Sequence, residues 1–215
     1  METVIENLPR FVDGFLMTLR LLLVSGAGAL VIGTVITAMR ISPVAAFRAF
    51  ATGYTELFRN IPLTLILFFC AFVLPYLQFK ADYVTLALIG LTLYTSPFVA
   101  EAIRSGINGV PVGQAEAARA IGLGFGATLG SVVLPQAIRM VIPPLINVLI
   151  ALTKNTSVAG GFAVVELFLS SRRLINDHGN ATVPILIAVA VFYLVITVPL
   201  GQFAVRLERK VAVLR

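Results

Sequence analysis

The chain has 215 residues, a formal charge of +6 and a hydrophobic content of 59%. This content, together with a mean hydropathy of +0.99, lies well above the roughly 45–50% typical of soluble domains and excludes a soluble globular protein. The basic residues are scattered between apolar runs, so membrane topology explains the positive charge better than nucleic-acid binding does. We therefore expect an all-α, polytopic protein in a lipid bilayer, with one membrane domain over residues 1–215.

Five apolar runs have about the length of 20 residues that a helix needs to cross the hydrocarbon core. In the first run, Ala29, Gly33 and Thr37 recur every four residues, so one face of that helix is small enough for another helix to approach closely. The predicted transmembrane helices cover residues 15–39, 61–77, 84–103, 138–153 and 183–203.

The lysines and arginines between these runs predict the orientation of the chain. With the N-terminus outside, ten of them lie on the cytoplasmic side and four lie outside, as the positive-inside rule requires. We therefore predict an external N-terminus and a cytoplasmic C-terminus. The ten cytoplasmic residues are Arg40, Arg48, Arg59, Arg104, Arg119, Arg139, Arg206, Arg209, Lys210 and Arg215.

The sequence offers no candidate for covalent or metal chemistry. Cys70 lies in an apolar run, and the lone histidine, His178, lies in a distant polar stretch, so they form neither a metal site nor a nucleophile with its base. A membrane-embedded enzyme is therefore disfavoured, and we expect no catalytic residue and no metal ligand. A phosphate-binding Gly-x-x-x-x-Gly-Lys-Ser/Thr motif is also missing from the sequence, so ATP would have to bind another subunit.

Between the third and fourth apolar runs, residues 104–135 form a segment too long for a simple turn. Residues 113–122 are rich in alanine and end at Gly122, which predicts a short helix closed by a left-handed glycine. We expect a second short helix over about residues 125–133 that stops before Pro135. The two helices would form a compact knob outside the membrane.

This segment resembles the EAA loop of ABC importer permeases, with valine where isoleucine is usual. The resemblance rests on Glu116-Ala117-Ala118, three residues, Gly122, nine residues, Val132, one residue and Leu134-Pro135. Between about residues 18 and 169, further motifs are similar to the polar amino-acid uptake permeases. These motifs are residues 56–62, 105–107, 110–114, 134–139, 143–144 and 154–157.

The resemblance implies a type I ABC importer permease in a bacterial cell membrane. It also implies two ATP-binding subunits that hold ATP and magnesium, a second identical or related permease subunit, and an external amino-acid-binding protein. In the family, the EAA loop is the coupling element that sits in a cleft of the ATP-binding subunit. The residues of this chain that take the coupling role are Gln114, Glu116, Ala117, Ala118, Arg119 and Gly122.

A solute site is predicted where the fourth span ends. Residues 144–153 correspond to roughly 15 Å of helix, about half the hydrocarbon thickness, and Gly160-Gly161 should break the helix soon afterwards. Transporters bind solutes at such mid-depth breaks, and Lys154 should face either a cavity or an acidic partner, Glu166 or Glu101. Alternatively, Lys154 forms a charge pair that only fixes helix packing. The predicted substrate path consists of Lys154, Asn155, Thr156 and Ser157, with Glu56 and Pro62 from the motif that opens the second span.

The residue at position 155 bears on the charge of the amino acid that is transported. Permeases of the family that the chain resembles often carry aspartate where this chain has Asn155, and a carboxylate there suits a cationic side chain. A neutral amide beside Lys154 predicts a non-cationic amino acid, such as glutamate or glutamine. The alternative function is that of an ion-coupled secondary transporter or a channel, which would need no ATPase and would leave the 104–135 segment without a purpose.

Overall fold

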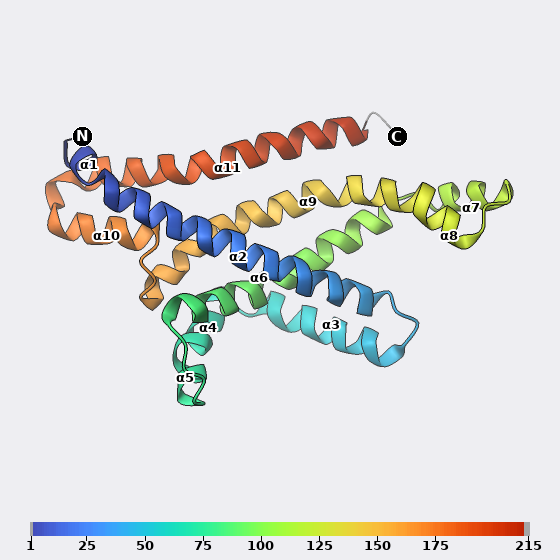
Figure 1. Cartoon of the computed structure of the whole chain (residues 1–215), viewed down its shortest axis with the longest axis horizontal. Helices are drawn as coiled ribbons and strands as arrows, with labels where there is room; N and C mark the ends of the chain where they lie inside the picture. The colour runs from blue at the N-terminus through green and yellow to red at the C-terminus, as the bar shows by residue number, and fades with distance from the viewer. Residues whose placement is uncertain (1, 213–215) are drawn as a thin grey trace.

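The computed structural model describes residues 2–212, with side chains through residue 209. Over this range the chain contains helices and no strands, which confirms the predicted all-α class. Four long helices, α2, α6, α9 and α11, run along the long axis of the molecule (Figure 1). The α-helices are α1 Glu2–Glu6, α2 Leu8–Arg40, α3 Ala45–Asn60, α4 Leu63–Phe68, α5 Leu74–Tyr76, α6 Tyr83–Asn108, α7 Val112–Ala120, α8 Phe125–Thr128, α9 Leu134–Asn155, α10 Leu167–Asp177 and α11 Thr182–Ala212.

The helices account for four or five membrane crossings. Four continuous helical stretches are long and apolar enough to span a bilayer: Leu8–Arg40, Tyr83–Asn108, Phe125–Phe162 and Gly179–Arg209. A fifth crossing exists if the bent pair Ala45–Asn60 and Leu63–Tyr76 counts as one span. Each of the five segments expected from the sequence overlaps one of these stretches.

Helix α3 was not expected from the sequence, and it meets α4 at a bend of 100°. The bend lies at Ile61 and Pro62, which both adopt extended backbone angles between the two helices. The ring of a proline disfavours helical geometry in the residue before it, so Pro62 ends α3 at Asn60. The predicted second span, 61–77, therefore begins at a corner of the fold, and the sixteen-residue helix α3 lies before that corner.

The expectation that a short helix stops before Pro135 is wrong. Helix α8 leads through a π-helical turn, Leu129–Val133, directly into α9, which begins at Leu134 with Pro135 in its first turn. A second π-helical turn, Phe69–Val73, precedes Pro75 in the same way. A π turn spaces the backbone more widely than an α turn, so it accommodates a proline ring and its missing N–H without ending the helix.

Helices α2 and α6 pack closely through the small residues that the sequence places on one face of α2. Gly33 lies directly against Val99 and the carbonyl oxygen of Ser96. The hydroxyl of Thr37 donates to the carbonyl oxygen of Ala100 over 3.1 Å. Both Ala29 and Thr37 are buried, so the small-residue face serves helix packing as predicted.

The close contact at Gly33 leads to a testable prediction for stability. A Cβ atom at this position would lie 2.6 Å from Cγ1 of Val99 and 2.8 Å from the Ser96 carbonyl oxygen. Gly33→Ala should therefore force α2 and α6 apart and destabilise the protein by about 1–3 kcal/mol, the usual cost of overpacking. Thermal denaturation in detergent, followed by size-exclusion chromatography, measures the effect.

Gly53 in α3 provides the matched control, because no described atom lies within 4 Å of a Cβ built there. Gly53→Ala should leave the melting temperature unchanged or raise it slightly, since alanine favours helix by about 1 kcal/mol over glycine. Equal melting temperatures for the two variants would contradict the close α2–α6 contact.

Candidate functional site

The fourth long helix changes its geometry at the polar cluster singled out in the sequence. Helix α9 ends at Asn155, and Thr156–Phe162 continues as a 3-10 helix that stops at Ala163, which has a left-handed φ of 64°. The α-helical geometry is therefore lost several residues before Gly160. This break leaves the last side chain of α9, Asn155, at the end of a helix.

Three hydroxyl groups around the break bond to the backbone of their own helix. Thr153 donates to the carbonyl oxygen of Leu149 over 2.8 Å, and Thr156 donates to that of Thr153 over 2.7 Å. Ser157 donates to the carbonyl oxygen of Lys154 over 2.7 Å. The bonds from Thr156 and Ser157 reach carbonyl groups in the last turn of α9, so these two side chains stabilise the break itself.

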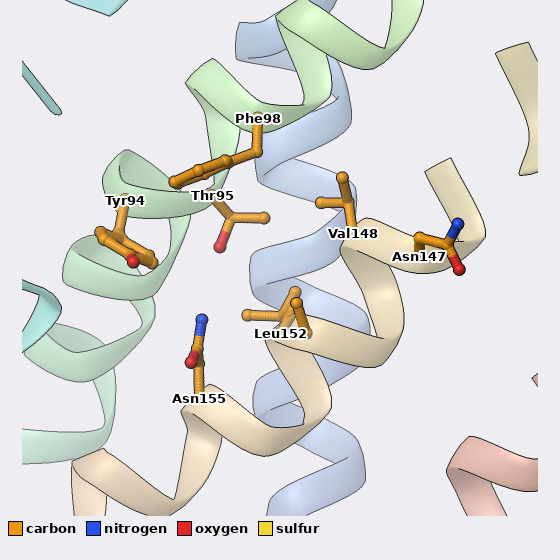
Figure 2. Close-up of a pocket in the computed structure, with 8 residues that line it drawn as sticks. Tyr94, Thr95, Phe98, Asn147, Val148, Leu152 and Asn155 are labelled. Carbon is orange, nitrogen blue, oxygen red and sulfur yellow. The ribbon is translucent and has the colours of Figure 1, made fainter. Parts of the chain in front are cut away.

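Helices α6 and α9 line an open-sided cavity of about 410 Å³, a size typical of small-molecule sites. Figure 2 shows side chains of α6 facing Val148, Leu152 and Asn155 of α9 across it. The cavity is lined by Tyr94, Thr95, Phe98, Asn147, Val148, Ala151, Leu152 and Asn155.

The cavity combines apolar walls with a few polar groups that lack internal partners. Among the described residues, the hydroxyl oxygen of Thr95 is the buried side-chain polar atom without a hydrogen-bond partner. The amides of Asn147 and Asn155 add donors and acceptors to the lining. Because buried polar atoms are nearly always paired in native proteins, the Thr95 hydroxyl is available to a bound solute or water.

The structure brings only one of the six residues of the predicted substrate path into this cavity, namely Asn155. Thr156 is fully buried in the helix break, and Lys154 is exposed beside Asn155. Glu56 and Pro62 are exposed on α3 and at its bend, and they are not among the lining residues in the described part of the chain.

Of the two alternatives predicted for Lys154, a cavity or an acidic partner, the structure does not show the pairing with Glu166 or Glu101, and both carboxylates have other partners. Glu166 caps the start of α10, accepting hydrogen bonds from the backbone N–H groups of Phe168 and Leu169, and also accepts one from the hydroxyl of Tyr193. Glu101 pairs with arginines. Within residues 2–209, Lys154 forms no ion pair, so it is free to meet a solute or a partner subunit.

Four lining residues with polar or aromatic side chains were missed from the sequence: Tyr94, Thr95, Phe98 and Asn147. All four lie inside predicted spans, where their side chains looked like ordinary helix packing. A usable signal existed in Asn147 and in Thr95-Ser96-Pro97, because polar residues and a proline in the middle of apolar spans are costly without a local role.

At one end of the molecule, the segment after α6 protrudes beyond the long helices (Figure 1). Helix α7 ends as expected, since Gly122 takes a left-handed φ of 87° before the chain enters α8. Glu116, Ala117 and Arg119 are exposed, and Ala118 faces inward. Three large apolar side chains around this surface are 71–80% exposed: Val112, Ile121 and Phe125.

Comparisons with known proteins agree with this architecture. The chain is 43% identical to the glutamate transport system permease protein GluC of Corynebacterium glutamicum, with 95% of each chain covered. It is 39% identical to the "Probable glutamine ABC transporter permease protein GlnM" of Bacillus subtilis, covering 95% of this chain and 94% of that one. A crystal structure of an amino acid ABC transporter with histidines superposes with a TM-score of 0.88 at 27% identity, covering 96% of each chain.

A family profile described as "Binding-protein-dependent transport system inner membrane component" matches residues 9–213, which is nearly the whole chain. The relatives match over nearly the same extent, and the superposed transporter shares the fold. The chain therefore belongs to the inner membrane components of binding-protein-dependent transport systems, a family of multi-pass permeases with the ABC importer fold.

Proposed function

We propose that the chain is the permease subunit of an ATP-driven importer for a polar, non-cationic amino acid such as glutamate or glutamine. The protruding surface of α7 and α8 carries the proposal. Its exposed apolar side chains, Val112, Ile121 and Phe125, would be costly in water and are suited to burial in a partner protein. A secondary transporter or a channel has no use for such a surface.

The partner at this surface is an ATP-binding subunit, which also holds ATP and magnesium. Helix α7 would sit in a cleft of that subunit, with Gln114, Glu116 and Arg119 making polar contacts and Ala117 allowing close approach. Packed interfaces shift between discrete arrangements, so a seated helix transmits rigid-body motion into α6 and α8. The end of the molecule that carries α7 would be cytoplasmic, and the end that carries α10 and the N-terminus would face outward.

Two further partners complete the importer. An external binding protein would deliver the amino acid to the outer end of the molecule. A second permease subunit, identical or related, would cover the open side of the cavity between α6 and α9 through a near-twofold interface. The solute would then pass between two such cavities.

The cavity supports a non-cationic solute. Its lining contains two amides, Asn147 and Asn155, and no carboxylate among the described residues, while the exposed Lys154 adds a positive charge beside it. The amide N–H groups can donate to the carboxylates of an amino acid, whereas a guanidinium or ammonium side chain would find no carboxylate to pair with in this lining. The names of the two relatives, which refer to glutamate and glutamine, support the same solute class.

Reconstitution into liposomes tests the proposal. Uptake of glutamate or glutamine should require an ATP-binding subunit, ATP and a binding protein together. The reason is that the motion of the ATP-binding subunit reaches the permease through α7. Leaving out any one of them should abolish uptake. Uptake by the purified chain alone, driven by an ion gradient, would instead support a secondary transporter.

Gly122 provides a test of the coupling surface. Alanine at a φ of 87° is strained by about 1–3 kcal/mol, so Gly122→Ala should redirect the end of α7 and reduce ATP-driven uptake about tenfold. Gly124 is the matched control, because it has an ordinary negative φ of −66° and open space around it in the described structure. Gly124→Ala should transport like the wild type. Full uptake by Gly122→Ala, with normal membrane insertion of both variants, would count against the coupling role.

Asn155 provides a test of solute selection. In Asn155→Asp, a carboxylate enters the cavity, so binding should shift from glutamate or glutamine toward arginine by about tenfold, equivalent to about 1.4 kcal/mol. Equilibrium binding of radiolabelled amino acids to the purified transporter, without the binding protein, measures the ratio. Asn176→Asp, an exposed amide of α10, is the control. Tight arginine binding by the wild type, unaffected by Asn155→Asp, would contradict the assignment.

A further inference from the structure

A cluster of charged side chains lies where α2, α3 and α6 meet. The carboxylate of Glu101 on α6 contacts the guanidinium of Arg40 from α2 and lies 3.0 Å from that of Arg104 on its own helix. The guanidinium of Arg59 from α3 approaches the same carboxylate to 3.7 Å. Glu101 thus serves as the common partner of three arginines from three helices.

The charges of this cluster do not balance. One carboxylate faces three permanently charged guanidinium groups, and the Glu101 side chain is only 23% exposed. Like charges repel more strongly in a partly buried site, so neutralising Glu101 would leave three cations to separate from one another. The positions of the three arginines therefore depend on this single carboxylate.

The three contacts differ in strength. Arg40 is mostly buried, and Arg104 donates two hydrogen bonds to the carboxylate from the next helical turn, so both hold Glu101 in place. Arg59 is 44% exposed and is the most distant of the three. The contact between Arg59 and Glu101 is therefore the one that can break and re-form.

Arg59 also connects the cluster to the cavity. The central carbon of its guanidinium lies 6.0 Å from the centre of the Phe98 ring, within the range of a cation–π contact. The ring of Phe98 forms part of the wall of the cavity, next to Tyr94 (Figure 2). A displacement of Arg59 would therefore remove a support from one wall of the cavity.

The cluster is equally close to the coupling surface. Glu101 lies about two turns before the end of α6 at Asn108, and only three residues separate that end from α7. At the same end of α6, Gly106 and Gly109 have no side chains, which allows the backbone to pack closely against Val141 and Met140 of α9. A movement of α7 would therefore carry the ends of α6 and α9 together, whereas α3 follows only through its side-chain contacts.

We propose that Glu101 is a positioning residue that acts through Arg59. Glu101 holds the guanidinium of Arg59 against the Phe98 ring. The shape of the cavity therefore changes when α7 changes its position. When α7 moves, the Arg59–Glu101 contact changes and the Phe98 wall moves with it. This inference rests on the proposed function, because it assumes that α7 is driven by an ATP-binding subunit.

The test compares solute imported with ATP hydrolysed in liposomes that contain the full complex. Glu101→Gln should lower the number of molecules imported per ATP about tenfold, while the rate of ATP hydrolysis stays within about twofold of the wild type. Glu101→Asp should recover part of the loss. Glu208→Gln, an exposed carboxylate near the end of α11, is the matched control and should behave like the wild type.

A double-mutant cycle tests the route through Arg59. Arg59→Gln alone should lower the import-to-ATP ratio as Glu101→Gln does, and the double variant should be no worse than either single variant. A ratio unchanged in Glu101→Gln, or losses that multiply in the double variant, would overturn the inference. If Glu101→Gln does not assemble, Arg59→Gln decides alone, because the Arg59 side chain is the most exposed of the cluster, at 44%. A wild-type complex without ATP-dependent import would overturn the proposed function itself.

Discussion

The close contact between α2 and α6 is the constraint on which the other helices depend. Within a hydrocarbon layer, apolar side chains gain little free energy by moving from lipid to protein. Helices therefore associate through close packing of their backbones and through hydrogen bonds between them. Gly33 and the hydroxyl of Thr37 supply both against α6. Further helices then pack on α6, among them α3 through the 2.7 Å hydrogen bond between Tyr54 and Ser96, and α9 through Gly106. Helix α6 is therefore the central element of the bundle.

The cavity follows from this arrangement and from the way α9 ends. The hydroxyls of Thr156 and Ser157 donate to carbonyl groups in the last turn of α9, so hydrogen bonds within the chain stabilise the break. Asn155 is thereby left as a polar side chain of α9 that points into the space beside α6. A permanent break of this kind keeps polar groups available at one depth while the neighbouring helices stay continuous.

The sequence was most informative where a single local pattern determines the structure. Long apolar runs located the spans, Gly122 located the end of α7, and the four-residue spacing of Ala29, Gly33 and Thr37 located a packing face. It was least informative where two distant segments decide the outcome. Arg59 could have paired with Glu56 along α3, and only the fold shows that it meets Glu101 of α6 instead.

The same limit applies to the cavity. Lys154 and Asn155 are neighbours in the sequence, yet only Asn155 lines the cavity, because successive residues of a helix point about 100° apart. Pro135 was misread for a different reason. A proline usually ends a helix, and nothing in the sequence nearby reveals that a wider turn will accommodate it.

The π-helical turn Leu129–Val133 has a further consequence, because it holds one residue more than an α turn would in the same length of helix. That surplus residue rotates everything before it by roughly 100° about the axis of α9. One additional backbone residue within Leu129–Val133 therefore determines which side chains of α8 face the bundle.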